Sequence, residues 1–363
     1  MGPGIAPTSE ELREVRALLL LKEGSGLGDG GIRKLVGSLG SGVRALRAQG
    51  HQMELLASST GVDPVLGWME EGFGVLPMTS SRYPRSLTDL TDPPPVIFLK
   101  GKQELLSLPA VAIVGSRRAT GTGRRAAETM GRILAGAGIT VVSGMALGLD
   151  GAAHRGALLG GGRTVAVLGS GFKKVYPASH RRLFHEIGEA GLLVSEFLPH
   201  EAALPYHFPK RNRIIAALAQ AVVVVEAGRK SGALITVDHG LDLGKDILAT
   251  PGSVENPQSL GSNTLLRDGA RVLIDPARVL EDLEEIGFDF RGSGGQDPVL
   301  TGPGLEIPSE LDSLWKTLGS EPVSVEEVAA NAAVPLADAL SGLFALELGG
   351  WVRQCPGMRF QRC

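Results

Sequence analysis

The sequence has little cysteine. Its 363 residues include only two, Cys355 and Cys363, and both lie near the C-terminus. Their spacing matches none of the patterns that bind zinc, and two cysteines so placed make no disulfide framework. We therefore expect no structural metal, and we expect a chain that works in a reducing compartment, the cytoplasm.

Long apolar runs and a secretion signal are also missing. The run from Ala17 to Leu21 is too short to cross a bilayer, and no other run is long enough. No positively charged start is followed by an apolar signal region. We expect no membrane insertion, which agrees with a cytoplasmic location.

The sequence lacks an excess of charge of one sign. It has 36 basic and 39 acidic residues, which leave a net charge of -3. A chain with this balance can bind nucleic acid only through a local basic patch. Its 43% hydrophobic and 21% charged residues are typical of a soluble globular protein, and its length allows two or three domains.

Recognisable catalytic motifs are absent as well. The seven histidines form no zinc-ligand spacing, and the chain has neither a G-x-S-x-G motif nor a phosphate-loop lysine motif. Gly121 to Ala126 matches the dinucleotide pattern G-x-G-x-x-A, but it begins several residues after the expected end of a strand. The next strand ends in Val142-Ser143, without the acidic residue that binds a ribose. We expect no enzyme activity and no cofactor.

Apolar β-branched runs that alternate with helix-like segments fill the middle of the chain. The clearest unit, Val111 to Asp150, is typical of a strand, a helix and a second strand. The runs are almost continuously apolar, as in strands buried on both faces. The alternation predicts an α/β fold with an extended Rossmann-like, doubly wound, mostly parallel sheet over residues 77–288. The expected strands are 96–99, 111–114, 140–142, 164–168, 192–195, 221–225, 246–249 and 271–273, and the expected helices are 123–137, 151–159, 180–189, 211–219 and 236–243.

Smaller modules are expected on both sides of this sheet. Residues 9–76 contain a helix, a glycine-rich hairpin and further helices, typical of a sterile-alpha-motif or helix-hairpin-helix module. Such a hairpin can hold a DNA phosphate, and the alternative is simple packing or dimerisation. Residues 289–306 are glycine-rich and aperiodic, which predicts a linker. Residues 307–363 contain three expected helices and a hairpin, which predicts a winged helix. Its third helix, 336–348, has no Lys or Arg, so we favour protein contact or packing over DNA for it.

Small and polar residues follow several of the expected strands. In a parallel sheet, ligands bind at the carboxyl ends of the strands, so these tips face one crevice. One tip also carries a guanidinium group, and two further loops allow close approach of a backbone. The candidate DNA-binding residues in these tips and loops are Gly115, Ser116, Arg117, Ser143, Gly144, Met145, Ala146, Gly169, Ser170, Lys174, Ser231, Gly232 and Asn263.

A basic cluster with a neighbouring aromatic residue lies where the fourth of these helices is expected to begin. Cations oppose the macrodipole at a helix N-terminus, so the cluster predicts an anionic partner. Single-stranded nucleic acid fits this arrangement, because a ring can stack on a base while cations hold phosphates. The residues are Phe208, Lys210, Arg211, Asn212 and Arg213.

Two other interpretations of the same cluster stay open. Arg211 or Arg213 can instead pair inside the protein with a carboxylate such as Asp150 or Glu226. Phe208 can belong to the hydrophobic core, which is the more common place for a phenylalanine. In either case the cluster by itself would require no anionic ligand.

Together these stretches resemble the bacterial DNA-processing protein A (DprA/Smf) family. The resemblance covers residues 83–274, and a helical N-terminal module and a C-terminal winged helix occur in many relatives. No single motif is decisive, but their order along the chain is specific. The matching stretches are 111–117, 142–150 with His154, 164–171, Tyr176-Pro177, 208–215, 230–236 and Pro251-Gly252.

The resemblance implies a function without turnover chemistry. Similar proteins bind single-stranded DNA through the sheet domain, with little sequence preference. They protect incoming single strands, help to load the RecA recombinase in natural transformation, and act as homodimers. By position, Ser116, Arg117 and the Ser143-Gly144 tip would hold phosphates, Phe208 would stack on a base, and residues 210–213 would border the groove.

This chain departs from the family pattern at two positions. Many relatives have lysine three residues before the phenylalanine, where this chain has Pro205, and a basic residue after the Tyr-Pro pair, where it has Ala178. We expect Lys173, Lys174 and Lys210 to supply the missing charge.

One enzyme family offers an alternative function. The sheet also resembles that of lysine-decarboxylase-like phosphoribohydrolases, which cleave nucleoside monophosphates with the glutamate of a P-G-G-x-G-T-x-x-E loop. The comparable loop here, 228–236, lacks that glutamate.

Overall fold

The chain forms two compact units, Met1–Gly294 and Gly295–Cys363. The computed structural model describes residues 7–50, 63–288, 311–319, 322–348, 351–355 and 357–362. The linker expected at 289–306 lies outside the described residues.

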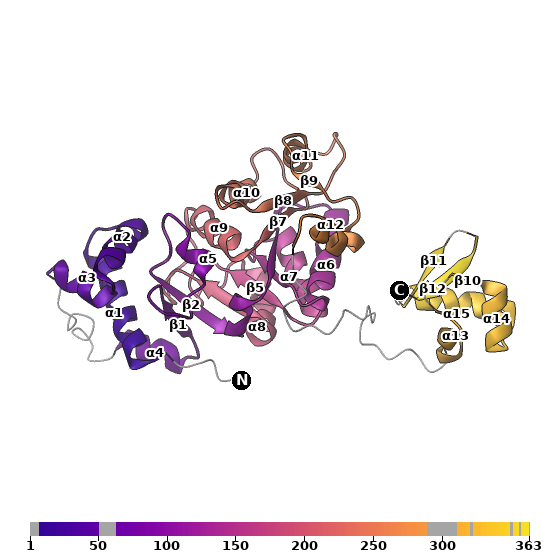
Figure 1. The fold of residues 1–363 in the computed structure, drawn as a ribbon, viewed down its shortest axis with the longest axis horizontal. Helices are drawn as coiled ribbons and strands as arrows, with labels where there is room; N and C mark the ends of the chain where they lie inside the picture. The colour runs from indigo at the N-terminus through magenta and orange to yellow at the C-terminus, as the bar shows by residue number, and fades with distance from the viewer. Residues whose placement is uncertain are drawn as a thin grey trace. The chain divides into compact units, whose positions relative to one another are not determined.

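A nine-stranded sheet is the centre of the larger unit (Figure 1). Its strand order is β1-β2-β6-β5-β4-β3-β7-β8-β9, and all neighbours from β6 to β9 are parallel, whereas β1 and β2 are antiparallel. This confirms the expected mostly parallel sheet. The strands are β1 (Gly74–Pro77), β2 (Val96–Gly101), β3 (Ala110–Val114), β4 (Thr140–Ser143), β5 (Thr164–Val167), β6 (Leu192–Ser195), β7 (Ala221–Val224), β8 (Asp246–Ala249) and β9 (Arg271–Val272).

The strand order reverses between β3 and β7. From β3 the chain proceeds outward through β4 and β5 to β6, then returns to β7 on the other side of β3 and proceeds to β9. The connections that leave β3 and β7 therefore diverge, and a crevice opens between them at the carboxyl ends of the strands. This switch point is where a doubly wound sheet is expected to bind its ligand.

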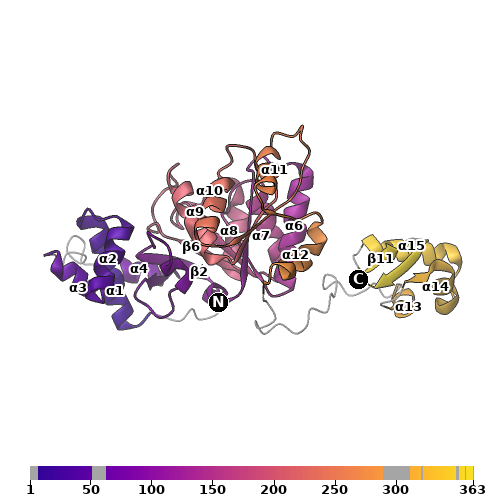
Figure 2. The same ribbon diagram turned by 45° about the horizontal axis from the view of Figure 1, so that its top comes forward.

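Helices cover both faces of the sheet (Figures 1 and 2). Alternate residues of β3 point to opposite cores: Ala112 and Val114 belong to one cluster, Val111 and Ile113 to the other. The first face is covered by α5 (Arg85–Thr88), α9 (His207–Leu218), α10 (Ala233–Asp242) and α11 (Leu260–Arg267). The second is covered by α6 (Gly121–Gly136), α7 (Leu149–Leu159), α8 (Arg181–Ala190) and α12 (Val279–Glu285).

Glycines let α6 and α7 approach closely. A Cβ atom at Gly156 would collide with the Glu128 carbonyl, and one at Gly160 would collide with the Arg132 carbonyl. Gly131 on α6 is equally close to the backbone of α7. Several glycines of this region thus allow the two helices to pack closely, and their presence does not imply a dinucleotide-binding site.

The N-terminal helices are part of the same unit. They are α1 (Ser9–Gly24), α2 (Asp29–Leu39), α3 (Gly42–Ala48) and α4 (Pro64–Glu70). Val15 and Leu18 of α1 share a hydrophobic cluster with Phe98 of β2 and Leu193 of β6. The domain boundary expected between 76 and 77 falls inside β1, so the helices and the sheet are not separate bodies. The first turn of α2 packs on the sheet domain, since Gly30 lies against the backbone at Thr91, whereas a Cβ at Gly26 or Gly28 of the hairpin would meet nothing within 4 Å.

The smaller unit has the elements of the expected winged helix. Its helices are α13 (Asp312–Lys316), α14 (Val325–Ala332) and α15 (Leu336–Leu348), and its sheet has the order β10-β12-β11, with β10 (Val323–Ser324), β11 (Val352–Cys355) and β12 (Arg359–Arg362). The Ser324 side chain accepts from the Glu327 amide, which forms the expected capping box at the start of α14. Among the described residues no single helix is long and apolar enough to cross a membrane, although α14 and α15, which meet at a sharp bend, pass the length and composition test together.

Candidate nucleic-acid interface

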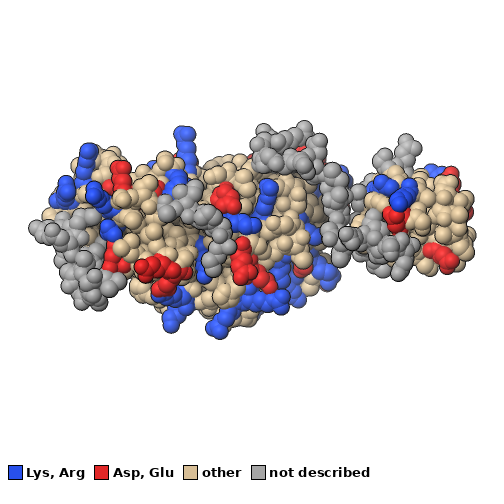
Figure 3. All heavy atoms as spheres, turned by 90° about the horizontal axis from the view of Figure 1, so that it is seen from below, with Lys and Arg blue, Asp and Glu red and all other residues tan. Residues whose placement is uncertain are grey.

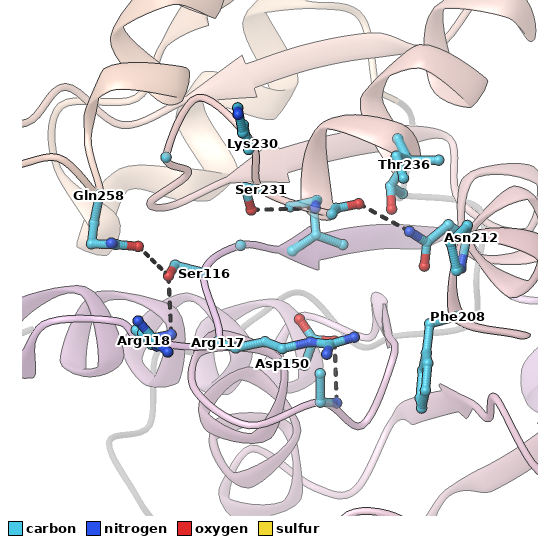
Figure 4. A pocket seen from close by; sticks show the side chains of 18 of the residues that line it. Ser116, Arg117, Arg118, Asp150, Phe208, Asn212, Lys230, Ser231, Thr236 and Gln258 are labelled. Carbon is cyan, nitrogen blue, oxygen red and sulfur yellow. Dashed lines mark hydrogen bonds between the residues drawn. The ribbon is translucent and has the colours of Figure 1, made fainter. Parts of the chain in front are cut away.

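A cavity of about 800 Å³ opens at the switch point between β3 and β7 (Figure 4). Four segments that are far apart in the sequence form its walls. They are 115–118 after β3, 208–212 in α9, 228–233 after β7, and 257–260 at the start of α11. The tips that follow β3 and β7 therefore meet at one edge of the sheet, as predicted, and they line one cavity.

Four exposed cations line this cavity. Arg117 and Arg118 come from the β3 tip, and Arg229 and Lys230 come from the β7 loop. None of the four forms an ion pair within the part of the chain that the structure describes. Larger areas of the surface carry both signs of charge, with Lys and Arg gathered along the lower margin of the face in Figure 3. The cavity is thus a local basic site in a chain of nearly neutral charge.

Three of these cations are not among the residues predicted from the sequence. Arg118, Arg229 and Lys230 were not among the candidate residues, although each follows an apolar strand within a few positions. The available signal was the pair of consecutive basic residues, Arg229 and Lys230, in the loop that follows β7. They line the same cavity as Pro205, one of the two positions that lack an expected basic residue.

One carboxylate lines the cavity, at Asp150 on α7. Burial raises its pKa, while the nearby guanidinium of Arg211 lowers it. Its Oδ2 accepts from the Ala146 amide at 3.3 Å. Asp150 therefore holds the β4 tip and does not oppose the four cations as an exposed charge.

Phe208 lies at the edge of the cavity with its ring half-buried (Figure 4). The Arg117 guanidinium stands 5.1 Å from the ring centroid, and the Tyr176 ring is 5.3 Å away at an angle of 48°. Gly169 packs beneath the ring, where any Cβ would touch it. A base could stack on this ring beside a cation. The position at the rim does not fit the alternative that Phe208 is a core residue.

The β3 tip is held by side-chain hydrogen bonds. The Ser116 hydroxyl donates to Gln258 at 2.6 Å and accepts from the Arg118 amide at 3.0 Å. A Cβ at Gly115 would collide with Leu149 and with the Glu226 carbonyl. Ser116 is itself buried, so it orients the two arginines that follow more than it exposes its hydroxyl.

The β4 tip corrects a prediction. Ser143 and Met145 are buried, and the Ser143 hydroxyl donates to the Ile113 carbonyl at 2.6 Å. The Gly144 carbonyl accepts from Arg211, so only Ala146 of this tip lines the cavity. A phosphate contact at the Ser143 hydroxyl is wrong, because that hydroxyl is already bonded inside the sheet.

The basic cluster of α9 also differs from its prediction. The helix begins at His207, four residues before the expected start, so the cations lie inside it rather than at its N-terminus. Arg211 is 3% exposed and donates to the carbonyls of Gly144 and Val167. Burial lowers its pKa to about 10, although Asp150 raises it. Arg211 lines the cavity floor, whereas the adjacent Asn212 supports the opposite wall by donating to the Gly232 carbonyl.

Arg213 and Lys210 point away from the cavity. Arg213 binds both oxygens of the Glu196 carboxylate at 2.8 Å, and Lys210 contacts Asp29 at 2.6 Å and Glu196 at 3.2 Å. The alternative of internal pairing is therefore correct for Arg213, with Glu196 in place of Asp150 or Glu226. Neither cation borders the proposed groove, because both tie α9 to buried carboxylates and to α2.

The remaining candidate residues divide between the cavity and its surroundings. Ser231 and Gly232 line the cavity. The buried Ser170 donates to the Lys174 carbonyl, and Asn263 bonds to Gly252; neither lines it. Lys174 is exposed outside it, and Lys173 pairs with Glu71 at 2.7 Å, so the expected compensation by Lys173 and Lys210 is wrong.

A buried histidine of α7, bonded to Thr164 at the start of β5, predicts a pH dependence of stability. His154 is fully buried, and burial, with His180 and Arg211, lowers its pKa from 6.5 to about 3. Its contribution to stability is complete above pH 6.5 and is lost as the pH falls towards 3, because the unfolded chain then binds the extra proton. Between pH 7 and pH 5 we expect a loss of about 2 kcal/mol from this group.

Urea unfolding of the wild type and of His154→Gln at the two pH values checks this expectation. The variant should show the shallower pH dependence. Groups such as Asp150, whose pKa burial raises, contribute to both proteins and cancel in the comparison. Equal pH dependence in both proteins would show that His154 is not the responsible group.

The chain is similar to known proteins over most of its length. The model of the family described as DNA recombination-mediator protein A matches residues 74–284, and that of the DprA winged helix domain matches residues 301–358. Protein Smf of Escherichia coli K12 is 35% identical over 298 residues, which are 82% of this chain and 79% of that protein. DNA processing protein DprA of Streptococcus pneumoniae is 41% identical over 202 residues, 56% of this chain and 71% of that protein.

Solved structures are also similar to the chain, among them those of two DNA processing proteins. The X-ray structure of DNA processing protein A from Streptococcus pneumoniae superimposes with a TM-score of 0.59 at 32% identity, covering 78% of this chain and 94% of that one. The structure of the Helicobacter pylori protein, described for its single-stranded DNA binding mode, gives 0.54 at 29% identity, covering 59% and 96%. The similarity thus extends from sequence motifs to the arrangement of the sheet.

Proposed function

This chain belongs to the DNA recombination-mediator protein A family, and from that membership we propose that it binds single-stranded DNA in the cavity between β3 and β7. One observation carries the proposal: four exposed cations without carboxylate partners line the same cavity as the half-buried Phe208 ring, and one of them, Arg117, lies over that ring. Cations hold phosphates of any sequence, and a ring stacks on any unpaired base. The site therefore suits single strands with little sequence preference.

The finer parts of the proposal come from family membership. We propose that the protein protects incoming single strands and helps to load the RecA recombinase during natural transformation, in the cytoplasm and as a homodimer. For the winged helix we propose a protein contact, because α15 contains no Lys or Arg and exposes Leu336 and Phe344.

We propose no turnover chemistry for the cavity. The loop after β7 contributes Arg229 and Lys230 to the cavity wall. Residues 228–236 contain no glutamate, which a phosphoribohydrolase would need in this loop for catalysis. Asp150, the carboxylate that lines the cavity, is bonded to the Ala146 amide. Release of free base from a nucleoside monophosphate by the purified protein would contradict this part of the proposal.

A binding experiment over a salt series tests the proposal. We expect the protein to bind an oligonucleotide of about 24 bases more tightly than the same sequence annealed to its complement, because stacking on Phe208 needs an unpaired base. The four phosphate contacts of the cavity contribute about -3 to the slope of log affinity against log salt. Fluorescence anisotropy gives both quantities. Equal affinity for the duplex, or a slope near zero, would exclude the cavity as a single-strand site.

A further inference from the structure

Exposed arginines continue from the cavity along α6. Arg118 lines the cavity, and the carbonyl of the next residue, Ala119, accepts from Arg124 at 2.8 Å. Arg125 folds back to the start of the helix, where it donates to Thr122 at 3.3 Å. Arg132 lies two turns further along the same helix. All four arginines are exposed.

These arginines lack the acidic partners that surface arginines usually have. None forms an ion pair among the residues that the structure describes, although Glu128 lies between Arg125 and Arg132 on the same helix. The first turn of α6 contains no acidic residue. The nearby Glu226 carboxylate is buried and accepts from the amide and hydroxyl of Thr120. The positive charge along α6 is thus left for a ligand from outside.

The arrangement differs from that of the α9 cations. Lys210 and Arg213 also lie in the first half of a helix, but buried carboxylates neutralise them. The α6 arginines face solvent and use only neutral acceptors, a carbonyl and a hydroxyl. Guanidinium groups with donors to spare bind phosphate oxygens well. The first of the four, Arg118, already stands at the cavity.

We propose that Arg118, Arg124, Arg125 and Arg132 form a second phosphate-binding segment, the α6 track, over which a single strand leaves the cavity. The inference rests on the proposed function, since it extends the path of the same strand. A short oligonucleotide fills the cavity alone, and a longer one also contacts the track. Contacts along the track hold phosphates and add affinity without sequence preference.

Oligonucleotides of two lengths and two charge-matched variants test the track. Arg124→Gln/Arg125→Gln removes two charges from the track, and Arg267→Gln/Arg278→Gln removes two from exposed positions that do not line the cavity. With oligothymidylate of about 24 bases we expect the track variant to bind about three- to tenfold more weakly and to lower the salt slope by about 1.4. With about 6 bases it should bind as the wild type does. The control variant should match the wild type at both lengths.

Three results would overturn the track. They are unchanged affinity for the longer oligonucleotide, an equal loss at both lengths, and an equal loss in the control variant. If the wild type bound neither length, the proposed function itself would fail, and this outcome is distinct from a track variant that binds both lengths normally. Anisotropy reports binding, and thermal unfolding of each variant shows that it is folded.

Discussion

Replacing Arg117 with alanine is expected to weaken the binding of every single-stranded oligonucleotide by about 10- to 150-fold. Arg117 is exposed at the cavity without a carboxylate partner, and its guanidinium lies 5.1 Å from the Phe208 ring centroid. The substitution removes both a phosphate donor and the cation beside the stacking surface. A hydrogen bond to a charged group contributes about 1.5–3 kcal/mol, which gives this range. Because phosphates carry no sequence information, the loss should be the same for all sequences.

Fluorescence anisotropy with oligonucleotides of different composition measures the Arg117 effect. Arg182→Ala is the matched control, since Arg182 is an exposed arginine of α8 that pairs with Glu186 and does not line the cavity. The control should bind as the wild type does. A loss confined to one base composition would point to base recognition by Arg117 rather than a phosphate contact. Unchanged binding would remove the β3 tip from the site.

Replacing Glu196 with glutamine is expected to lower the free energy of unfolding by about 3–5 kcal/mol. Glu196 is 1% exposed and accepts two hydrogen bonds from Arg213 at 2.8 Å each. Burial alone would raise its pKa, but Arg213 and Lys210 keep the pKa below its usual value. The substitution leaves the Arg213 guanidinium buried with too little negative charge around it. Loss of one partner of a buried ion pair is costly for this reason.

Urea unfolding at neutral pH measures the Glu196 effect. Glu186→Gln is the control, because Glu186 is an exposed carboxylate that pairs with Arg182 one turn away. It should leave the unfolding free energy unchanged, as exposed ion pairs contribute little. Equal unfolding free energies of Glu196→Gln and the wild type would show that the ion pairs joining α9 to α2 do not stabilise the fold.

The sequence alone predicted the architecture because the information for it is local. Runs such as Val111–Val114 are continuously apolar and end at glycine, which is typical of a short strand covered on both faces. Parallel strands place their carboxyl ends at one edge, so Gly115 to Arg117 had to lie at the ligand-binding side. The capping box at Ser324 is equally local, since its two residues are three positions apart. These features needed no knowledge of distant residues.

The roles of the site residues could not be predicted in the same way, because they depend on partners far away in the chain. Lys210 pairs with Asp29 across 181 positions, and no pattern around residue 210 reveals that carboxylate. The phase of α9 is set by burial of Ile214 and Ile215 against the sheet, and that phase turns Arg213 towards Glu196. Local sequence therefore decided which segments are strands, helices and tips. Only the tertiary structure decided which cations are neutralised inside the protein and which remain for a ligand, because charge compensation is set by distance in space and not by distance along the chain.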